Sequence, residues 1–304
     1  MDNVEAVWRC FETYCAWSGQ AINLDKSKKK FSPKTKVHCK KSILRRSGFK
    51  EMSSGSLYLG NQLIFGKNRS KDFGRLKNRV QAKLEGWRNH LLSRAGKATL
   101  IKSVVQAIPQ YTMSTFRVPD GVCNELDALI CKFWWGTNKS GRFLALKCWD
   151  SICQPKEFGG LGFRKFRDIN SALLSKLGWN LLTEENKLWI SLVKAKYLKN
   201  SNFFDYHLKN GVSFSWRSIV TAREVLRKGV LFNLGDGKSI RPWKDPWIPW
   251  LEGGVPVLKQ GQEINDVRKV SDLKLVDGNE WNLDLLNDLC EPDSVEAIKR
   301  IKWP

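Results

Sequence analysis

Apolar residues recur at helical spacing in the most patterned stretch of the chain, between residues 73 and 91. They fall at steps of three and four, which is typical of an amphipathic helix with one buried stripe. The stripe consists of Phe73, Leu76, Val80, Leu84, Trp87 and Leu91. The other faces carry Lys71, Arg75, Lys77, Arg79, Lys83 and Arg88. The pattern therefore predicts a helix that is apolar on one side and strongly positive elsewhere.

A second helix is predicted directly after the first. Ser93 is of the residue type that caps helix N-termini, and Pro109 cannot continue a helix. The apolar stripe between them is Leu100, Ile101, Val104, Val105 and Ile108. The two segments together predict a basic helical hairpin.

Further elements follow from the same reading. Helices are expected over 1–17, over 122–135 with Gly136 ending it, from a cap at Asp168 or Asn170 to about 182, over 187–198 and over 213–229, with weak helices near Leu283 and Ala297. Short strands are expected over 21–24, in a hairpin over 57–66, and in a hairpin over 231–249 that turns at Asp236-Gly237. Gly159, Gly160 and Gly162 predict a tight turn. The expected fold class is mainly α with small β-hairpins (α+β).

Charge changes the picture of what these helices contact. The 304-residue chain has a net charge of +22, and residues 1–120 hold 24 Lys and Arg against 8 Asp and Glu. From residue 251 onward the balance is reversed, with 7 against 11. A basic field of this size indicates a polyanionic partner, most commonly nucleic acid. A membrane surface fits less well because the helical stripes are of the core-facing kind.

The eight cysteines and the apolar runs bear on the compartment. The cysteines lie mostly in apolar stretches beside only three histidines, which indicates reduced thiols in an intracellular protein rather than a zinc site. No apolar run reaches the length of a membrane span. The N-terminal residues lack the apolar core of a secretory signal.

Several stretches resemble one known family. Leu92–Pro119, LSRAGKATLIKSVVQAIPQYTMSTFRVP, resembles the thumb of LINE-type (non-LTR) retrotransposon reverse transcriptases of the plant lineage. Four further stretches look like parts of the same proteins: the palm-closing motif SGQAINLDKS, the primer-grip turn LYLG, the signature CKFWWG, and CWDSICQPKEFGGLGFR. WKDPWIP resembles the segment before the family's zinc-binding region. The resemblance covers about residues 10–249.

This resemblance implies a division of the chain and a partner. It implies a palm-edge remnant with a primer-grip hairpin (1–66), a basic helical thumb (67–120), a post-thumb helical region (121–229), and a β-hairpin with an acidic, partly ordered tail (230–304). The implied partners are RNA and DNA as a template–primer duplex, held through phosphates with little sequence specificity, and no small-molecule substrate is evident. The candidate contacts are Tyr58, Gly60, Arg69, Lys77, Arg79, Lys83, Arg88, Lys97 and Lys102.

Catalysis is not expected from this chain alone. Polymerases of this family hold Mg²⁺ with a catalytic aspartate pair, which would lie upstream of residue 1. The first 60 residues hold only scattered acids, with no adjacent pair, and one acid cannot hold two metal ions. No cofactor or metal is therefore expected for this chain. Lys26 matches a family lysine that acts near the leaving group, although a solvated lysine in a basic run is the favoured reading.

Alternatives remain open at several points. The basic patch from Lys28 to Arg46 is either a nucleic-acid contact or a nuclear address, so the expected location is the nucleus, the cytoplasm or both. Trp134 and Trp135 either stack on bases or fill the core. The chain as a whole is a polymerase fragment that still binds nucleic acid, a retained RNA- or DNA-binding module, or an inert retroelement remnant.

Overall fold

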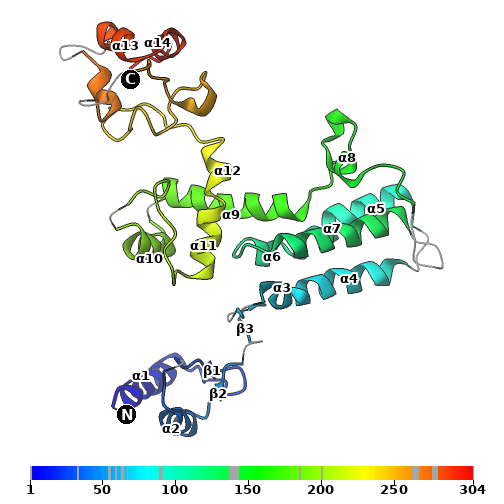
Figure 1. The fold of residues 1–304 in the computed structure, drawn as a ribbon. Helices are drawn as coiled ribbons and strands as arrows, with labels where there is room; N and C mark the ends of the chain where they lie inside the picture. The colour runs from blue at the N-terminus through cyan, green and yellow to red at the C-terminus, as the bar shows by residue number, and fades with distance from the viewer. Residues whose placement is uncertain are drawn as a thin grey trace. The chain divides into compact units, whose positions relative to one another are not determined.

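The computed structural model describes residues 2–303 apart from 33, 54–55, 59, 63–64, 67, 89–91, 137–143, 185, 200, 262–266 and 276–279. Within these residues the chain is mainly helical with two small two-stranded sheets (Figure 1). The expected fold class is therefore confirmed. The chain forms two compact units, Met1–Ala82 and Lys83–Pro304. The four-segment division expected from the sequence stays a prediction.

The first unit begins with two helices joined by a short parallel sheet. Its elements are α1 (Asp2–Ser18), β1 (Lys28–Lys29), α2 (Val37–Ser47) and β2 (Lys50–Glu51). The ring of Trp8 on α1 lies 5.6 Å from that of Phe49. The rest of the predicted apolar face of α1 is largely uncovered, since Val7 and Tyr14 are each more than half exposed.

The strand expected over 21–24 is wrong. Asn23 instead opens a turn, in which its side-chain oxygen accepts a hydrogen bond from the backbone amide of Lys26 at 3.0 Å. The amide of Ser27 also donates to the Asn23 carbonyl at 2.9 Å. Asn side chains stabilise such turns, and this local bonding competes with the extended conformation. The strand forms a few residues later, at β1.

The predicted hairpin and the predicted basic helix are both confirmed. β3 (Leu57–Tyr58) pairs antiparallel with β4 (Asn61–Gln62), and Tyr58 lies opposite Asn61. A short helix, α3 (Arg69–Asp72), then leads into α4 (Gly74–Arg88), where the boundary between the two units falls. Phe73 and the predicted α4 stripe residues Leu76, Val80 and Leu84 are all buried.

Helix α7 (Asp120–Trp135) belongs to the helical core of the second unit. It packs against α5 (Arg94–Leu100) and against α9 (Phe166–Thr183), and α9 also contacts α6 (Gln110–Met113) (Figure 1). As predicted, Ser93 caps α5, accepting the amide of Gly96 at 3.1 Å. α5 continues into a π-helical segment, Ile101–Val105, and the helical stretch ends before Pro109.

Neither residue expected to cap α9 does so. The helix begins at Phe166, and its first amide donates to the carboxylate of Asp127 on α7 at 3.3 Å. Asn170 is buried instead and bonds the backbone of the segment before α7. Its oxygen accepts the amide of Val118 at 2.8 Å, and its amide nitrogen donates to the carbonyls of Met113 and Phe116. Sequence spacing alone could not show that this backbone segment needed a partner.

A second core forms around the end of α9. It is built with α10 (Leu188–Tyr197), α11 (Phe214–Thr221) and α12 (Arg223–Arg227), all of which the sequence pattern predicted. Trp216 lies at its centre, 1% exposed, with its ring stacked 4.9 Å from that of Tyr197. The remaining short helices of this part are α8 (Trp149–Cys153) and a 3₁₀ turn at Lys156–Phe158.

The β-hairpin expected over 231–249 is wrong. The segment has no strand ladder, and its backbone bonds to distant segments: the amide of Val270 donates to the carbonyl of Ile240 at 3.0 Å, and the amide of Ser271 to that of Gly237 at 3.1 Å. One further bond, from the amide of Phe232 to the carbonyl of Pro246 at 2.7 Å, lies inside the segment but does not extend into a strand ladder.

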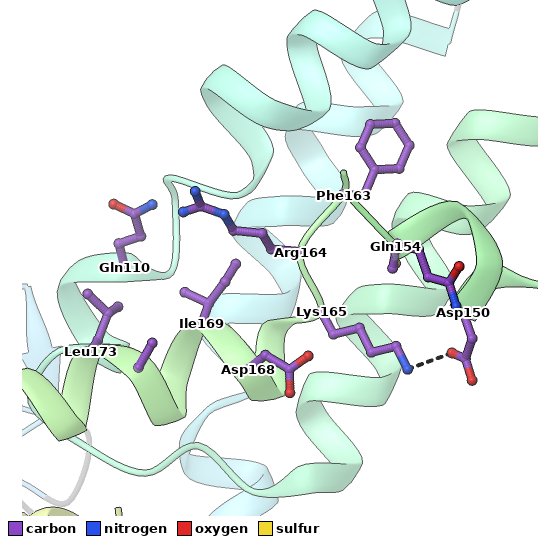
Figure 2. A pocket seen from close by; sticks show the side chains of 11 residues that line it. Gln110, Asp150, Gln154, Phe163, Arg164, Lys165, Asp168, Ile169 and Leu173 are labelled. Atoms are coloured by element: carbon purple, nitrogen blue, oxygen red, sulfur yellow. Dashed lines mark ion pairs between the residues drawn. The ribbon is translucent and has the colours of Figure 1, made fainter. Parts of the chain in front are cut away.

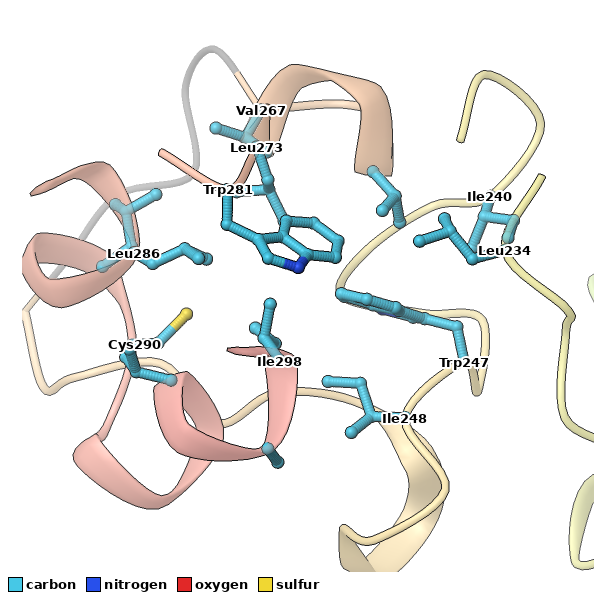
Figure 3. Packing of buried hydrophobic residues seen from close by; sticks show 14 residues of the cluster. Leu234, Ile240, Trp247, Ile248, Val267, Leu273, Trp281, Leu286, Cys290 and Ile298 are labelled. Carbon is cyan, nitrogen blue, oxygen red and sulfur yellow. The ribbon is translucent and has the colours of Figure 1, made fainter. Parts of the chain in front are cut away.

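The described residues of the C-terminal part form several short helical elements, and the expectation of a partly ordered tail stays a prediction. Two 3₁₀ turns, Glu252–Gly254 and Val270–Leu273, are followed by α13 (Leu283–Leu289) and α14 (Pro292–Lys299). They pack a core around Trp247 and Trp281, whose rings lie 5.7 Å apart (Figure 3). Leu273, Leu286 and Ile298 are fully buried there.

Candidate nucleic-acid interface

A row of exposed cations runs along the first unit's basic helices. Lys71, Arg75 and Arg79 are exposed and follow one another at four-residue steps, a rise of about 6 Å per step in a helix. Asn68 caps α3, accepting the amide of Lys71 at 3.1 Å. The α4 stripe between these cations is buried, so the helix presents its charge outward as predicted.

The hairpin offers an exposed side chain and an open turn. Tyr58 is 62% exposed on β3. Gly60 has φ +84°, a conformation that favours glycine, and among the described residues other than its chain neighbours no atom lies within 4 Å of the position of a Cβ there. Such a turn leaves room for a ligand to approach the backbone.

Two predicted contacts of the first unit are less available. Arg69 is half-buried, with its guanidinium carbon 5.3 Å from the ring centroid of Phe65. Lys77 is half-buried as well. Both side chains therefore contribute to packing rather than standing free in solvent.

The predicted contacts at the end of α4 give a mixed result. Lys83 is exposed, with its Nζ 5.9 Å from the Trp87 ring. The side chain of Arg88 and residue Leu91 lie outside what the structure describes.

The cations of α5 lie against aromatic rings of α7, and the expected contact of Lys97 with nucleic acid stays a prediction. Arg94 lies over the rings of Trp134 and Trp135, at 5.1 and 5.3 Å from carbon to centroid, and also donates to the Trp134 carbonyl. Lys97 Nζ lies 5.6 Å from the Phe133 ring. Burial, and then the charge of Arg94, lower the pKa of Lys97. Cations over aromatic faces stabilise packing, so these two residues serve the α5–α7 contact first.

Lys102 keeps more of its freedom. Its Nζ lies 5.7 Å from the Phe163 ring, yet the side chain is exposed. It reaches the backbone at Gly162, where a Cβ would lie 3.7 Å from Nζ. Lys102 is therefore the predicted contact of the α5 region that best fits a phosphate.

Base stacking by Trp134 does not fit the structure. Its side chain is 8% exposed and packs edge-on against Phe163, at 5.3 Å between centroids. Trp135 is half-buried beside it. The core reading of Trp134 is confirmed, because a buried ring offers no face to a base.

The lysine-rich patch of the first unit lies on α2 and the turns around it. Residues 26–50 contain eleven Lys and Arg and no Asp or Glu. Lys50 pairs with Asp25 at 3.1 Å and Lys40 with Glu51 at 3.4 Å, both acids lying just outside this stretch. Lys26 is exposed at the Asn23 turn, and its suggested leaving-group role stays a prediction. The patch is a second positive surface.

One pocket was not anticipated from the sequence. It has a volume of about 760 Å³ and lies between α8, the extended segment 161–165 and the start of α9 (Figure 2). Gln110, Gln154, Arg164 and Asp168 supply its polar groups, while Ile169 supplies an apolar surface. The GGLGFR motif predicted the turn that forms one wall of the pocket, but the motif gave no indication of the pocket itself.

Burial and pairing shift the pKa of several titratable groups near this pocket. Burial is the main cause that raises the pKa of Asp127 to about 6 and that of the Cys153 thiol to about 12. The hydrogen bond to Asp150 raises the pKa of Lys165. In the described part of the chain, no three His, Cys, Asp or Glu side chains are grouped so as to hold a metal ion.

Comparison with known proteins gives two plant relatives. Over 143 residues, 47% of this chain, the sequence is 34% identical to an uncharacterized mitochondrial protein of Arabidopsis thaliana and covers 93% of that protein. The chain belongs to the family of this mitochondrial protein. Over 202 residues it is 38% identical to a putative ribonuclease H protein of the same plant, of which it spans 32%. No protein-family profile matches the sequence.

These relatives support the coarser part of the sequence reading. They are consistent with a plant, retroelement-related protein. Assignment to the thumb of a LINE-type reverse transcriptase goes beyond them. Among the described residues, no helix combines the length and apolar character required to span a bilayer.

Proposed function

We propose that this chain is the part of a retrotransposon reverse transcriptase that holds the template–primer duplex. It binds RNA–DNA duplex through phosphate contacts, with little sequence preference. From the putative ribonuclease H relative we take only the class of partner, nucleic acid.

The exposed row of Lys71, Arg75 and Arg79 is the observation that carries this proposal. The opposite side of the same helical stretch is buried, so the three charges face solvent at a regular spacing. A cationic helix face of this kind binds a phosphate backbone and reads no base identity. Lys83 and Lys102 are further exposed cations of the same thumb-like stretch.

We propose no catalysis by this chain alone. Asp25, the acid nearest to the palm-like motif, is paired with Lys50. A polymerase needs several converging carboxylates for its Mg²⁺ ions. The metal would belong to the intact polymerase, and the expected location remains the nucleus, the cytoplasm or both.

A second candidate is a binding module retained without its polymerase. The mitochondrial relative favours it, because 93% of that protein matches this chain. The region that matches this chain thus makes up most of the mitochondrial protein. On this candidate the duplex-binding surface is the same, and only the missing catalytic part differs.

The test is binding of the purified chain to a labelled RNA–DNA hybrid across a salt series. Each phosphate contact contributes to the slope of log K against log salt. Arg75→Gln with Arg79→Gln should weaken binding and lower that slope by about 1–2. Lys199→Gln with Lys209→Gln, which removes two exposed charges elsewhere, is the matched control. No binding at low salt would favour the inert-remnant reading, and an unchanged slope would remove the thumb assignment.

A further inference from the structure

The pocket beside α9 has walls that are fixed by backbone hydrogen bonds. The amide of Leu161 donates to the carbonyl of Ile152 at 2.8 Å, and that of Gly162 to the carbonyl of Gln154 at 2.9 Å. On the other side, Gln106 Nε2 donates to the carbonyl of Arg164 at 2.7 Å. The segment that carries Arg164 is therefore held before any ligand arrives, which lowers the entropy cost of binding.

One side of the pocket is apolar. Ala172, which is exposed, and Leu173, which is half-buried, present aliphatic surface of α9 to the cavity, whereas Ile169 beside them is largely buried. Figure 2 shows Ile169 and Leu173 side by side beneath Arg164. A flat, apolar ligand group can bury one face here.

The polar groups lie around this apolar surface. Arg164 extends toward Gln110, while Lys165 turns away to pair with Asp150 at 2.7 Å (Figure 2). Because Lys165 and Asp150 pair with each other, the charged groups of the pocket that can contact a ligand are Arg164 and Asp168. Lys102 lies close by along the backbone, since its Nζ is beside Gly162 and Phe163.

We infer that this pocket binds one unpaired nucleotide of the nucleic acid that the chain holds. The base lies on the surface formed by Ala172 and Leu173, Asp168 and the two glutamines bond its edge, and Arg164 meets its phosphate. The inference rests on the proposed function, because it takes nucleic acid as the partner. A base within a duplex is covered on both faces and paired at its edge, so only an unpaired base can enter.

The carboxylate of Asp168 gives the pocket a preference among bases. It accepts hydrogen bonds and offers none when ionised, so it favours a base with an exocyclic amine. Adenine carries an exocyclic amine, whereas an unpaired thymine offers only its N3–H, which is flanked by two carbonyl oxygens that a carboxylate repels. An unpaired adenine is therefore expected to bind better than an unpaired thymine.

The test uses the full chain and RNA–DNA hybrids that differ at one position of the DNA strand. The hybrids are fully paired, or carry one extra adenine, one extra thymine, or one extra abasic nucleotide. The abasic hybrid has the same added phosphate and flexibility but no base. Dissociation constants are measured by fluorescence anisotropy at one salt concentration.

We expect the extra adenine to improve binding roughly fivefold over the abasic hybrid, because burying one face of the base against aliphatic side chains removes apolar surface from water. Ala172→Gln fills the pocket from an exposed helical position and should abolish this gain while leaving binding to the paired hybrid unchanged. Ala195→Gln makes the same change at an exposed position of α10 and should keep the gain. Asp168→Asn should narrow the difference between adenine and thymine.

The outcomes separate this inference from the proposed function. Equal binding of the adenine and abasic hybrids, with paired duplex still bound, would overturn the pocket and leave duplex binding in place. A gain that survives Ala172→Gln would place the base elsewhere and overturn the inference as well. Failure of every hybrid to bind would reject both.

Discussion

Arg94 lies over the ring of Trp134 and donates a hydrogen bond to the same residue's carbonyl. One side chain thereby joins the first residue of α5 to the end of α7. A guanidinium suits this position because it is planar and always charged, and it can stack and donate at once. Arg94 thus holds two helices together.

Replacement of Arg94 should therefore cost stability more than binding. Arg94→Gln is expected to lower the free energy of unfolding by about 1–3 kcal/mol, since it removes the cation from two tryptophan faces and a charged donor from a carbonyl. Denaturant unfolding followed by tryptophan fluorescence measures the loss. Arg79→Gln, at an exposed position, should leave stability within about 0.5 kcal/mol. Equal stability of the two variants would contradict the role given to Arg94.

Asn170 should be among the most sensitive polar residues of the second unit. Asn170→Ala leaves one amide and two carbonyls of 113–118 without their partner, at an expected cost of about 2–4 kcal/mol. Asn180→Ala on the same helix is the control, because that side chain is only half-buried. Thermal unfolding of the two variants checks the prediction, and a small effect at Asn170 would show that water replaces these bonds.

The charge of Asp127 should make stability depend on pH. Its pKa is about 6 in the folded chain and near 3.8 when unfolded, so between these values the folded state binds more protons than the unfolded state. Its contribution to stability is therefore full below about pH 4 and is lost as pH rises through about 6.

The matching variant tests this sign. Asp127→Asn keeps an oxygen for the Phe166 amide but carries no charge. The gain in free energy of unfolding over the unaltered chain should therefore be larger at pH 8 than at pH 4. The expected difference is roughly 1–2 kcal/mol. Denaturant midpoints measured at pH 4, 6 and 8 give the comparison. Parallel pH profiles for the two chains would contradict the prediction.

Gly160 should not tolerate any side chain. A Cβ there would lie 2.0 Å from the carbonyl oxygen of Gln154, which is backbone and cannot move aside cheaply. Gly160→Ala is expected to lower the free energy of unfolding by about 3 kcal/mol, the upper end of the usual cost of overpacking. It should also disturb the pocket wall. Gly121→Ala in α7 has open space around it and should be neutral or slightly stabilising. Circular dichroism melting curves distinguish the two.

Local signals in the sequence predicted the local elements correctly. The Ser93 cap, the end of the helical stretch before Pro109 and the buried stripe of α4 each depend on residues within a few positions of one another. The glycine turn at 159–162 belongs to the same class: Gly159 and Gly162 have φ of +76° and +66°. Such features are set by backbone sterics and helical periodicity, which a single sequence displays.

The wrong predictions concern partners that are distant in the sequence. Asp127 caps α9 from another helix, and residues 237 and 240 in the expected hairpin accept hydrogen bonds from 271 and 270. The pocket could not be foreseen for the same reason, since its lining comes from separate segments between Gln110 and Leu173. In the candidate interface, the charge was predictable but the aromatic rings beneath Arg94 and Lys97 were not.

The segment 203–206 is held by three arginines from two directions. Arg223 donates to the carbonyls of Phe203 and Tyr206, and Arg227 to that of Phe204, all from α12. Arg241, from the C-terminal core, pairs with Asp205 and with Asp245. A chain that ended after α12 and before Phe232 would lack the Arg241 cation that pairs with Asp205. It would also lack the ring of Phe232, which lies 6.3 Å from that of Phe204. The C-terminal core thus stabilises the helical part through segment 203–206. Limited proteolysis should therefore yield one fragment that contains both parts rather than two separate fragments.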